Sequence, residues 1–141
     1  MEEIKRYTVP SIKIKDLRKI MEHKVVTVQK DYTIEELVTK FREYDFHGFP
    51  VLDKDELVGV VTKTDLLKII TITERKLSRM FASHVEDIMT PHPITITPKT
   101  NLLEAVDIMN KNRIRTLPIL DGERLVGLLS YSDLVKTVFK F

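Results

Sequence analysis

One short segment occurs twice in this chain, first as Leu57-Val58-Gly59-Val60-Val61-Thr62-Lys63-Thr64-Asp65 and again, 68 residues later, as Leu125-Val126-Gly127-Leu128-Leu129-Ser130-Tyr131-Ser132-Asp133. In the same register, Ile20–Ile70 and Ile88–Val138 share 14 identities in 51 gap-free positions. Ordinary composition would give about three. The chain is therefore one unit written twice, which is the observation to settle before any motif is interpreted.

Each copy predicts the element order β-α-β-β-α. The β-branched runs Val25–Val28 and Ile94–Ile96 predict a first strand. Apolar residues at helical spacing then predict a helix in each copy, through Leu37, Val38 and Phe41 and through Ala105, Val106 and Met109.

A hairpin and a last helix complete each copy. The predicted hairpin strands are Phe49–Leu52 with Leu57–Val61, and Leu117–Leu120 with Leu125–Leu129. Asp121-Gly122 is a dipeptide typical of a type I′ turn. The last helix is predicted to begin near Lys63 in the first copy and near Tyr131 in the second. We expect Thr71–Ser83 to extend the first of these helices and to link the copies.

Chain length favours two copies that pack together. A single copy of roughly 55 residues would bury only about 60% of its surface and would be marginally stable. We therefore predict an α/β (α+β) fold of two tandem repeats packed around a pseudo-twofold axis, with a ligand cleft between them. The predicted parts are an N-terminal tail or arm at 1–15, a first repeat with its linking helix at 16–83, and a second repeat at 84–141.

Composition excludes several classes of function. The 141 residues contain no cysteine, which excludes disulfides, thiolate metal sites and cysteine nucleophiles. Lys and Arg number 23 and Asp and Glu 21, so the net charge of +2 argues against nucleic-acid binding. The basic residues of 63–79 are interpreted as a solvated helix face. With neither an apolar span nor a signal-peptide core, we expect a soluble cytoplasmic protein with no membrane partner.

The repeated polar residues have two interpretations. A helix N-terminus suits phosphate, Thr62 or Ser130 can donate to phosphate oxygens, and Asp65 or Asp133 can accept hydrogen bonds from the two hydroxyls of a ribose. The same Thr/Ser-x-x-Asp spacing is equally typical of a helix N-cap followed by an acidic residue in the first turn. Both interpretations stay open on spacing alone.

The doubled motif, preceded in each copy by an apolar-Pro-apolar-Leu-Asp run, resembles the CBS domain, and two such domains in tandem resemble a Bateman module. The resemblance covers about Asp16 to Val138. It implies a non-catalytic regulatory protein that binds an adenosyl ligand, such as AMP, ADP, ATP, S-adenosylmethionine or NAD, between its repeats. It implies no separate cofactor, and it makes a homodimer and an unidentified client protein the expected protein partners. No metal is expected either, because the four histidines lack ligand spacing and cysteine is absent.

The resemblance also assigns residues to two sites. In each site the motif Asp would hold the ribose, its neighbouring Thr or Ser would lie near phosphate, and the partner repeat would contact adenine. One site would comprise Val60, Thr62, Thr64 and Asp65 with Met89, Ile94, Ile114 and Arg115. The other would comprise Leu128, Ser130, Ser132 and Asp133 with Met21, Val26, Phe46 and His47.

The two sites are not expected to be equivalent. Three residues before the repeated proline lies Arg115 in one copy and His47 in the other. Arg115 is always charged whereas His47 is only partly charged near neutral pH, so the Asp65 site should prefer more negative ligands. Gly48 and Thr116 stand where the family often has a basic residue. That departure favours AMP, ADP or a nucleoside over a triphosphate.

Three further functional hypotheses remain beside the sensor. A structural or interaction module would use the motifs only as helix caps. An enzyme would need a nucleophile–base pair, a metal cluster or a glycine-rich phosphate loop, and the sequence shows none of these patterns. A nucleic-acid binder would show salt-dependent binding. If the chain is a sensor, ligand binding stabilises one relative orientation of the repeats, or one dimer geometry, by its difference in affinity.

Overall fold

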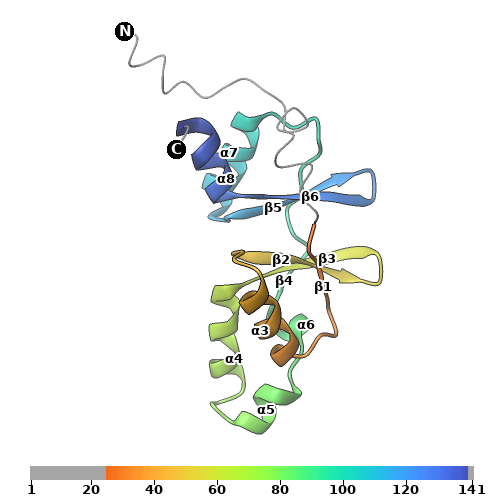
Figure 1. The fold of residues 1–141 in the computed structure, drawn as a ribbon, viewed down its shortest axis with the longest axis vertical. Coiled ribbons are helices and arrows are strands. Elements are labelled where there is room, and N and C mark those ends of the chain that lie inside the picture. The colour runs from red at the N-terminus through yellow and green to blue at the C-terminus, as the bar shows by residue number, and fades with distance from the viewer. Residues whose placement is uncertain (1–24, 140–141) are drawn as a thin grey trace. The chain divides into compact units, whose positions relative to one another are not determined.

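The computed structural model describes residues 25–139, except for the side chains of Thr137 and Val138 (Figure 1). These residues fall into two compact units that divide after Pro93. The first unit is Val26–Pro93 and the second begins at Ile94. The predicted tail at 1–15 lies outside the described residues.

The first unit contains a mixed four-stranded sheet in the order β1-β2-β3-β4. Strand β1 (Val28–Gln29) pairs in parallel with β2 (Gly48–Asp53), which forms an antiparallel hairpin with β3 (Glu56–Thr62). Strand β4 (Thr90–Pro91) pairs antiparallel with β3. This pairing brings a segment that precedes the second unit onto the sheet of the first.

The helices of the first unit are α3 (Ile34–Glu43), the 3-10 turn η2 (Lys63–Asp65), α4 (Leu66–Ile72), α5 (Leu77–Ala82) and α6 (Val85–Ile88). Figure 1 shows α3, α4 and α6 on one side of the sheet. Thr33 and Glu36 form a capping box that starts α3, which explains why the helix begins at that point. The core against the sheet includes Leu37, Phe49, Val51, Val61 and Ile88, all buried.

The second unit repeats this plan with fewer elements. It contains α7 (Leu102–Asn112), the hairpin of β5 (Thr116–Asp121) and β6 (Arg124–Ser130), and α8 (Tyr131–Phe139). Its buried residues include Leu102, Ala105, Leu117, Ile119 and Leu129. Four of these, Ala105, Leu117, Ile119 and Leu129, occupy the positions equivalent to Leu37, Phe49, Val51 and Val61.

Both hairpins were predicted and both are confirmed, but the turn type differs. Their two-residue loops are Lys54–Asp55 and Gly122–Glu123, since Asp53 pairs with Glu56 and Asp121 with Arg124. Only the first loop residue has a positive φ, 57° at Lys54 and 64° at Gly122. Type I′ requires positive φ at both central residues, so the type I′ prediction for Asp121-Gly122 was wrong and the pattern is that of type II′.

Two other element predictions need correction. The runs Val25–Val28 and Ile94–Ile96 form little strand: only Val28 of the first lies in β1, and Ile96 of the second makes a single bridge to Ile119. The last helix of the first copy is not continuous through 83. It ends at Ile72 because Glu74 and Arg75 adopt left-handed φ values of 52° and 63°, and α5 then begins anew.

Candidate functional site

The repeated motif lies where β3 ends and α4 begins, as its sequence pattern predicted. Asp65 is buried, with 6% of its surface exposed. Its Oδ2 accepts a hydrogen bond from the backbone N–H of Thr62 (2.8 Å) and one from the Thr62 hydroxyl (3.1 Å). The hydroxyls of Thr62 and Thr64 are 2.9 Å apart. A buried carboxylate and two hydroxyls therefore gather at one helix start.

These bonds match the reciprocal half of a helix cap, in which the acidic side chain returns to the backbone N–H of the first capping residue. The capping interpretation of the motif is thus realised in this structure. It does not use up the acceptor capacity of Asp65, since an ionised carboxylate offers about four lone-pair positions. Both interpretations of the motif remain compatible with this geometry.

Met89 lies against the motif strand. A Cβ placed on Gly59 would lie 2.6 Å from Met89 Sδ and 2.9 Å from the carbonyl oxygen of Thr90. Glycine is therefore required here so that the segment entering β4 can approach β3 closely. The contact unites five predicted site residues in one unit, which we call the first half-site: Val60, Thr62, Thr64, Asp65 and Met89.

The second unit contains the equivalent motif with a different hydrogen-bond pattern. The Ser130 hydroxyl donates to Asp133 Oδ2 (2.7 Å) and accepts from the Asp133 backbone N–H (3.1 Å). The second bond is a true side-chain N-cap of α8. We call Leu128, Ser130, Ser132 and Asp133 the second half-site. Leu128 and Ser130 are half-buried.

The remaining predicted residues are distributed over both units. Ile94, Ile114 and Arg115 belong to the second unit, and Val26, Phe46 and His47 belong to the first. Met21 lies outside the described residues. Arg115 and His47 have exposed side chains. Each predicted site thus draws on both units, and its assembly remains a prediction.

His47 and Arg115 occupy equivalent places within their own units. The His47 carbonyl accepts from the Lys63 N–H at 3.0 Å, and the Arg115 carbonyl accepts from the Tyr131 N–H at 2.7 Å. Each therefore lies beside the helix start of its own repeat. Phe46, next to His47, stacks on Tyr44 with ring centroids 5.5 Å apart and is 42% exposed. An exposed aromatic ring and the exposed His47 side chain are thus neighbours in the first unit.

The two missing basic residues have a steric explanation. A Cβ on Gly48 would lie 2.7 Å from the Val61 carbonyl oxygen, so no larger side chain fits there. Thr116 is 7% exposed, and a charged side chain at that position would be buried. Neither position can present a cation to a ligand phosphate without rearrangement.

Sequence reasoning missed one residue of the first half-site. Lys68 Nζ lies 2.8 Å from Asp65 Oδ1 and donates to the Ile88 carbonyl at 3.4 Å. The sequence pattern of 63–79 predicts only a solvated basic face for this lysine. The available signal was the internal repeat, because Lys68 and Lys136 are among the 14 identical pairs.

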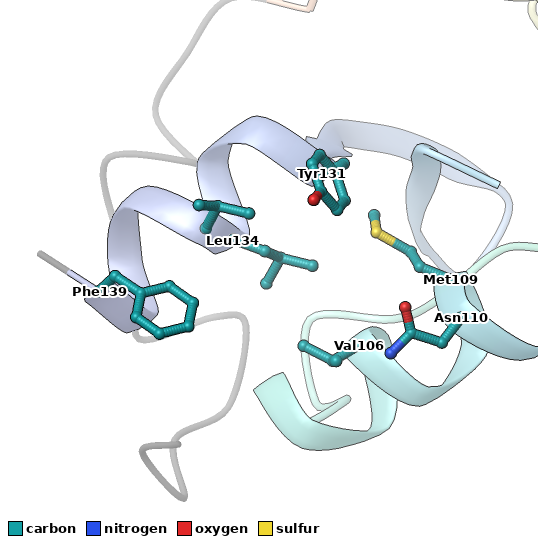
Figure 2. A pocket seen from close by; sticks show the side chains of 7 residues that line it. Val106, Met109, Asn110, Tyr131, Leu134 and Phe139 are labelled. Atoms are coloured by element: carbon teal, nitrogen blue, oxygen red, sulfur yellow. The ribbon is translucent and has the colours of Figure 1, made fainter. Parts of the chain in front are cut away.

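A separate apolar pocket of about 180 Å³ lies between α7 and α8 (Figure 2). Val106 and Met109 from α7 and Leu134 from α8 point into it, with Tyr131 and Phe139 at its ends. Tyr131 and Phe139 are 51% and 48% exposed. The motif residues Ser130 and Asp133 do not line it. This surface therefore differs in chemistry from the second half-site.

The described residues contain neither a metal-binding cluster nor a membrane-spanning helix. Within 25–139, no group of three or more His, Asp or Glu side chains is placed to hold a metal ion. The same part of the chain has no helix long and apolar enough to cross a membrane.

Comparison with known proteins gives one family. The CBS domain family matches residues 14–72 and 85–140. Inosine-5'-monophosphate dehydrogenase of Methanocaldococcus jannaschii is 33% identical over 114 residues, which are 79% of this chain and 21% of that protein. The chain thus spans about a fifth of this relative's length. Other curated relatives are covered over 41% and 58% of their length.

Solved structures agree with the fold. A putative signal-transduction protein with CBS domains from Burkholderia ambifaria has a TM-score of 0.75 and 32% identity, over 83% of this chain and 84% of that one. CBSX2, solved in complex with AMP, has a TM-score of 0.75 and 26% identity, over 91% and 96%. The mixed α+β fold of this chain is therefore one that tandem CBS-domain proteins also have.

Proposed function

The chain belongs to the CBS domain family, and from that premise we propose that it is a non-catalytic sensor that binds an adenosyl ligand through its two Thr/Ser-x-x-Asp motifs. The observation that carries the proposal is the duplicated juxtaposition of an Asp carboxylate with a hydroxyl at a helix start. Asp65 lies with Thr62 in the first half-site, and Asp133 with Ser130 in the second. The complex of CBSX2 with AMP supports an adenosine-containing ligand.

Each group has a defined chemical task in this proposal. A ribose presents two neighbouring hydroxyl donors, which a carboxylate can accept together. Thr64 and Ser132 add hydroxyl donors close to each helix start, where the backbone partial charge favours phosphate. Apolar residues, among them Val60 and Met89, would contact the adenine ring. We propose that each ligand also contacts the other unit, through Ile94, Ile114 and Arg115 or through Met21, Val26, Phe46 and His47.

We propose that the favoured ligands are AMP, ADP or an adenine nucleoside, and that ATP binds less tightly. Neither Gly48 nor Thr116 supplies a positive charge for a ligand phosphate. The position of Gly48 is sterically closed to a larger side chain, and that of Thr116 is buried. Three residues before the repeated proline, the Asp65 site would have Arg115, which carries a positive charge, whereas the Asp133 site would have His47. More negative ligands should therefore prefer the Asp65 site.

We further propose that the chain forms a homodimer through the faces of α4 and α8. Leu67 and Ile70 on α4 are 66% and 44% exposed, and Tyr131 and Phe139 border the apolar pocket of α7 and α8 (Figure 2). Leu67 is the repeat equivalent of Val135, which lines that pocket. Burial of these side chains in a second copy would remove them from water. Ligand occupancy would then be transmitted as a change in repeat or dimer geometry to an unidentified client protein.

A thermal-shift panel tests the proposed function. The panel contains AMP, ADP, ATP, S-adenosylmethionine, 5'-methylthioadenosine, NAD and GTP, with the intact chain, Asp65→Ala and Asp133→Ala. A ligand at about 100 times its Kd adds roughly 2.7 kcal/mol, or several degrees at about 2–4 °C per kcal/mol. We expect a shift confined to adenosyl ligands and reduced in each variant. A flat panel would leave both motifs as helix caps only.

A further inference from the structure

Lys68 occupies a place in the first half-site that a structural ion pair does not fully explain. Its ammonium lies 2.8 Å from Asp65 Oδ1, while Oδ2 of the same carboxylate is occupied by Thr62. The Lys68 side chain is 51% exposed and that of Asp65 is 9% exposed. The ammonium therefore lies where the buried carboxylate meets solvent, which is the direction from which a ligand must approach.

The hydrogen-bond count leaves one donor for a ligand. An ammonium group has three N–H donors. One is directed to Asp65 and a second to the Ile88 carbonyl at 3.4 Å. Among the described residues Lys68 has no third partner. A hydroxyl that donates its proton to Asp65 still has lone pairs on its oxygen, and these can accept the third N–H.

We propose that Lys68 is a ligand-binding residue of the first half-site: Asp65 accepts the proton of a ribose hydroxyl while Lys68 donates to the oxygen of that hydroxyl. This inference rests on the proposed adenosyl-binding function and adds a residue to it. The pair makes the site specific for that one ribose hydroxyl, because the deoxy analogue that lacks it offers neither the proton for Asp65 nor the oxygen for Lys68. The ammonium also offsets the carboxylate charge, which would otherwise repel a phosphate nearby.

The position of Lys68 in the half-site supports this role. Its second partner, Ile88, immediately precedes Met89, which packs against Gly59 and is proposed to contact adenine. Lys68 thus lies between the ribose-binding carboxylate and the adenine-binding segment. Lys136 occupies the equivalent position in the second repeat, three residues after Asp133.

The alternative is that Lys68 only tethers α4 to α6 through Asp65 and Ile88. Removal of a tether would weaken every ligand by the same factor, because the half-site as a whole would lose its shape. Removal of a hydroxyl contact would weaken only ligands that carry the hydroxyl. The two roles are therefore separated by varying the protein and the ligand together.

The experiment is an isothermal titration of AMP, 2′-deoxy-AMP and 3′-deoxy-AMP in an Asp133→Ala background, so that only the first half-site reports. The variants are Lys68→Met and Lys68→Arg, and Lys68→Gln replaces Lys68→Met should the latter not fold. The matched control is Lys111→Met, which removes an exposed lysine paired with Asp107 at 2.9 Å on α7. Intact chain is titrated alongside.

In the Asp133→Ala background we expect AMP to bind at least about tenfold more tightly than one of its deoxy analogues, as for a hydrogen bond to a charged group. Lys68→Met should lose most of this preference by weakening AMP while leaving that analogue nearly unchanged. Lys68→Arg should keep part of the preference, and Lys111→Met all of it.

Four results would overturn the inference, and they are distinguishable. If Lys68→Met lowers the affinity for AMP and for both analogues equally, Lys68 is a tether. If the preference for AMP is unchanged, Lys68 has no role in binding. The proposed function survives both results. If the intact chain binds AMP but the Asp133→Ala variant does not, the ligand does not bind at the first half-site. If the intact chain binds no adenosyl ligand, the proposed function fails and this inference fails with it.

Discussion

Replacing Gly59 with alanine tests how closely the segment entering β4 approaches the motif strand. The new Cβ would lie 2.6 Å from Met89 Sδ and 2.9 Å from the Thr90 carbonyl oxygen, against an ordinary contact of 3.4 Å or more. The neighbours must therefore move by about 0.5–0.8 Å, and one of them is backbone. Overpacking of this kind costs about 1–3 kcal/mol. The β3–β4 pairs of Gly59 with Pro91 and Val60 with Thr90 should weaken.

Gly127 provides the matched control, since it occupies the same motif position in the second repeat. The three nearest atoms to a Cβ there all belong to the Ile119 side chain, Cδ1 at 3.1 Å and Cβ and Cγ1 at 3.8 Å. A small rotation of Ile119 relieves this contact. Any remaining cost is offset because alanine within a strand is more stable than glycine by about 0.5–1 kcal/mol. Gly127→Ala should therefore change the free energy of unfolding by less than about 1 kcal/mol.

Thermal and urea unfolding monitored by circular dichroism would compare the two variants. At about 2–4 °C per kcal/mol, Gly59→Ala should lower the melting temperature by about 2–12 °C. It should also weaken any ligand held by the first half-site, because Met89 is displaced. Equal stability of the two variants would refute the argument that close approach at Gly59 shapes this half-site.

Three further predictions concern other contacts. Ser130→Ala removes the cap that accepts the Asp133 N–H and should lower the free energy of unfolding by about 0.5–2 kcal/mol in urea titration; no change would show that this cap contributes nothing. The pKa of Lys30 is raised, first by its hydrogen bond to Asp53 and then by the charge of that carboxylate. The stabilising contribution of Lys30 is therefore complete below the unfolded pKa of about 10.5 and is lost as pH rises through the higher folded value. The stability difference between the intact chain and Lys30→Gln should accordingly shrink above about pH 10.5, and a difference independent of pH would contradict the assignment. Leu67→Asp should shift the molecular mass in light scattering from dimer to monomer, whereas Leu103→Asp, which also replaces an exposed leucine, should not; a dimer that persists in Leu67→Asp would exclude the α4 face.

The features that sequence predicted well depend on local pattern repeated at a fixed distance. The hairpins follow from short apolar runs on both sides of a polar turn. Both copies place a bulge at the equivalent point, after Val51 and after Ile119. The Thr/Ser-x-x-Asp motif was placed at the correct strand end for the same reason. Local chemistry is enough there, because the residues that interact are only three apart.

The features that sequence missed depend on partners distant in the chain. Val25–Val28 has strand composition, but only Val28 and the following residue pair with β2, since pairing requires a neighbour in register. The break after Ile72 requires two consecutive left-handed residues at Glu74 and Arg75, which are not residues that usually adopt this conformation. The contact of Lys68 with Ile88 spans 20 residues, and no periodicity predicts it.

In the proposed function the two motif carboxylates hold an adenosyl ligand and are more than helix caps. Isothermal titration of the intact chain and of an Asp65→Asn, Asp133→Asn double variant with AMP and with 5'-methylthioadenosine tests it most directly, because asparagine retains the size of the side chain and part of its capping capacity. We expect saturable binding by the intact chain to at least one of the two ligands and a loss of at least tenfold in affinity in the folded double variant. Equal affinity in both proteins would contradict it.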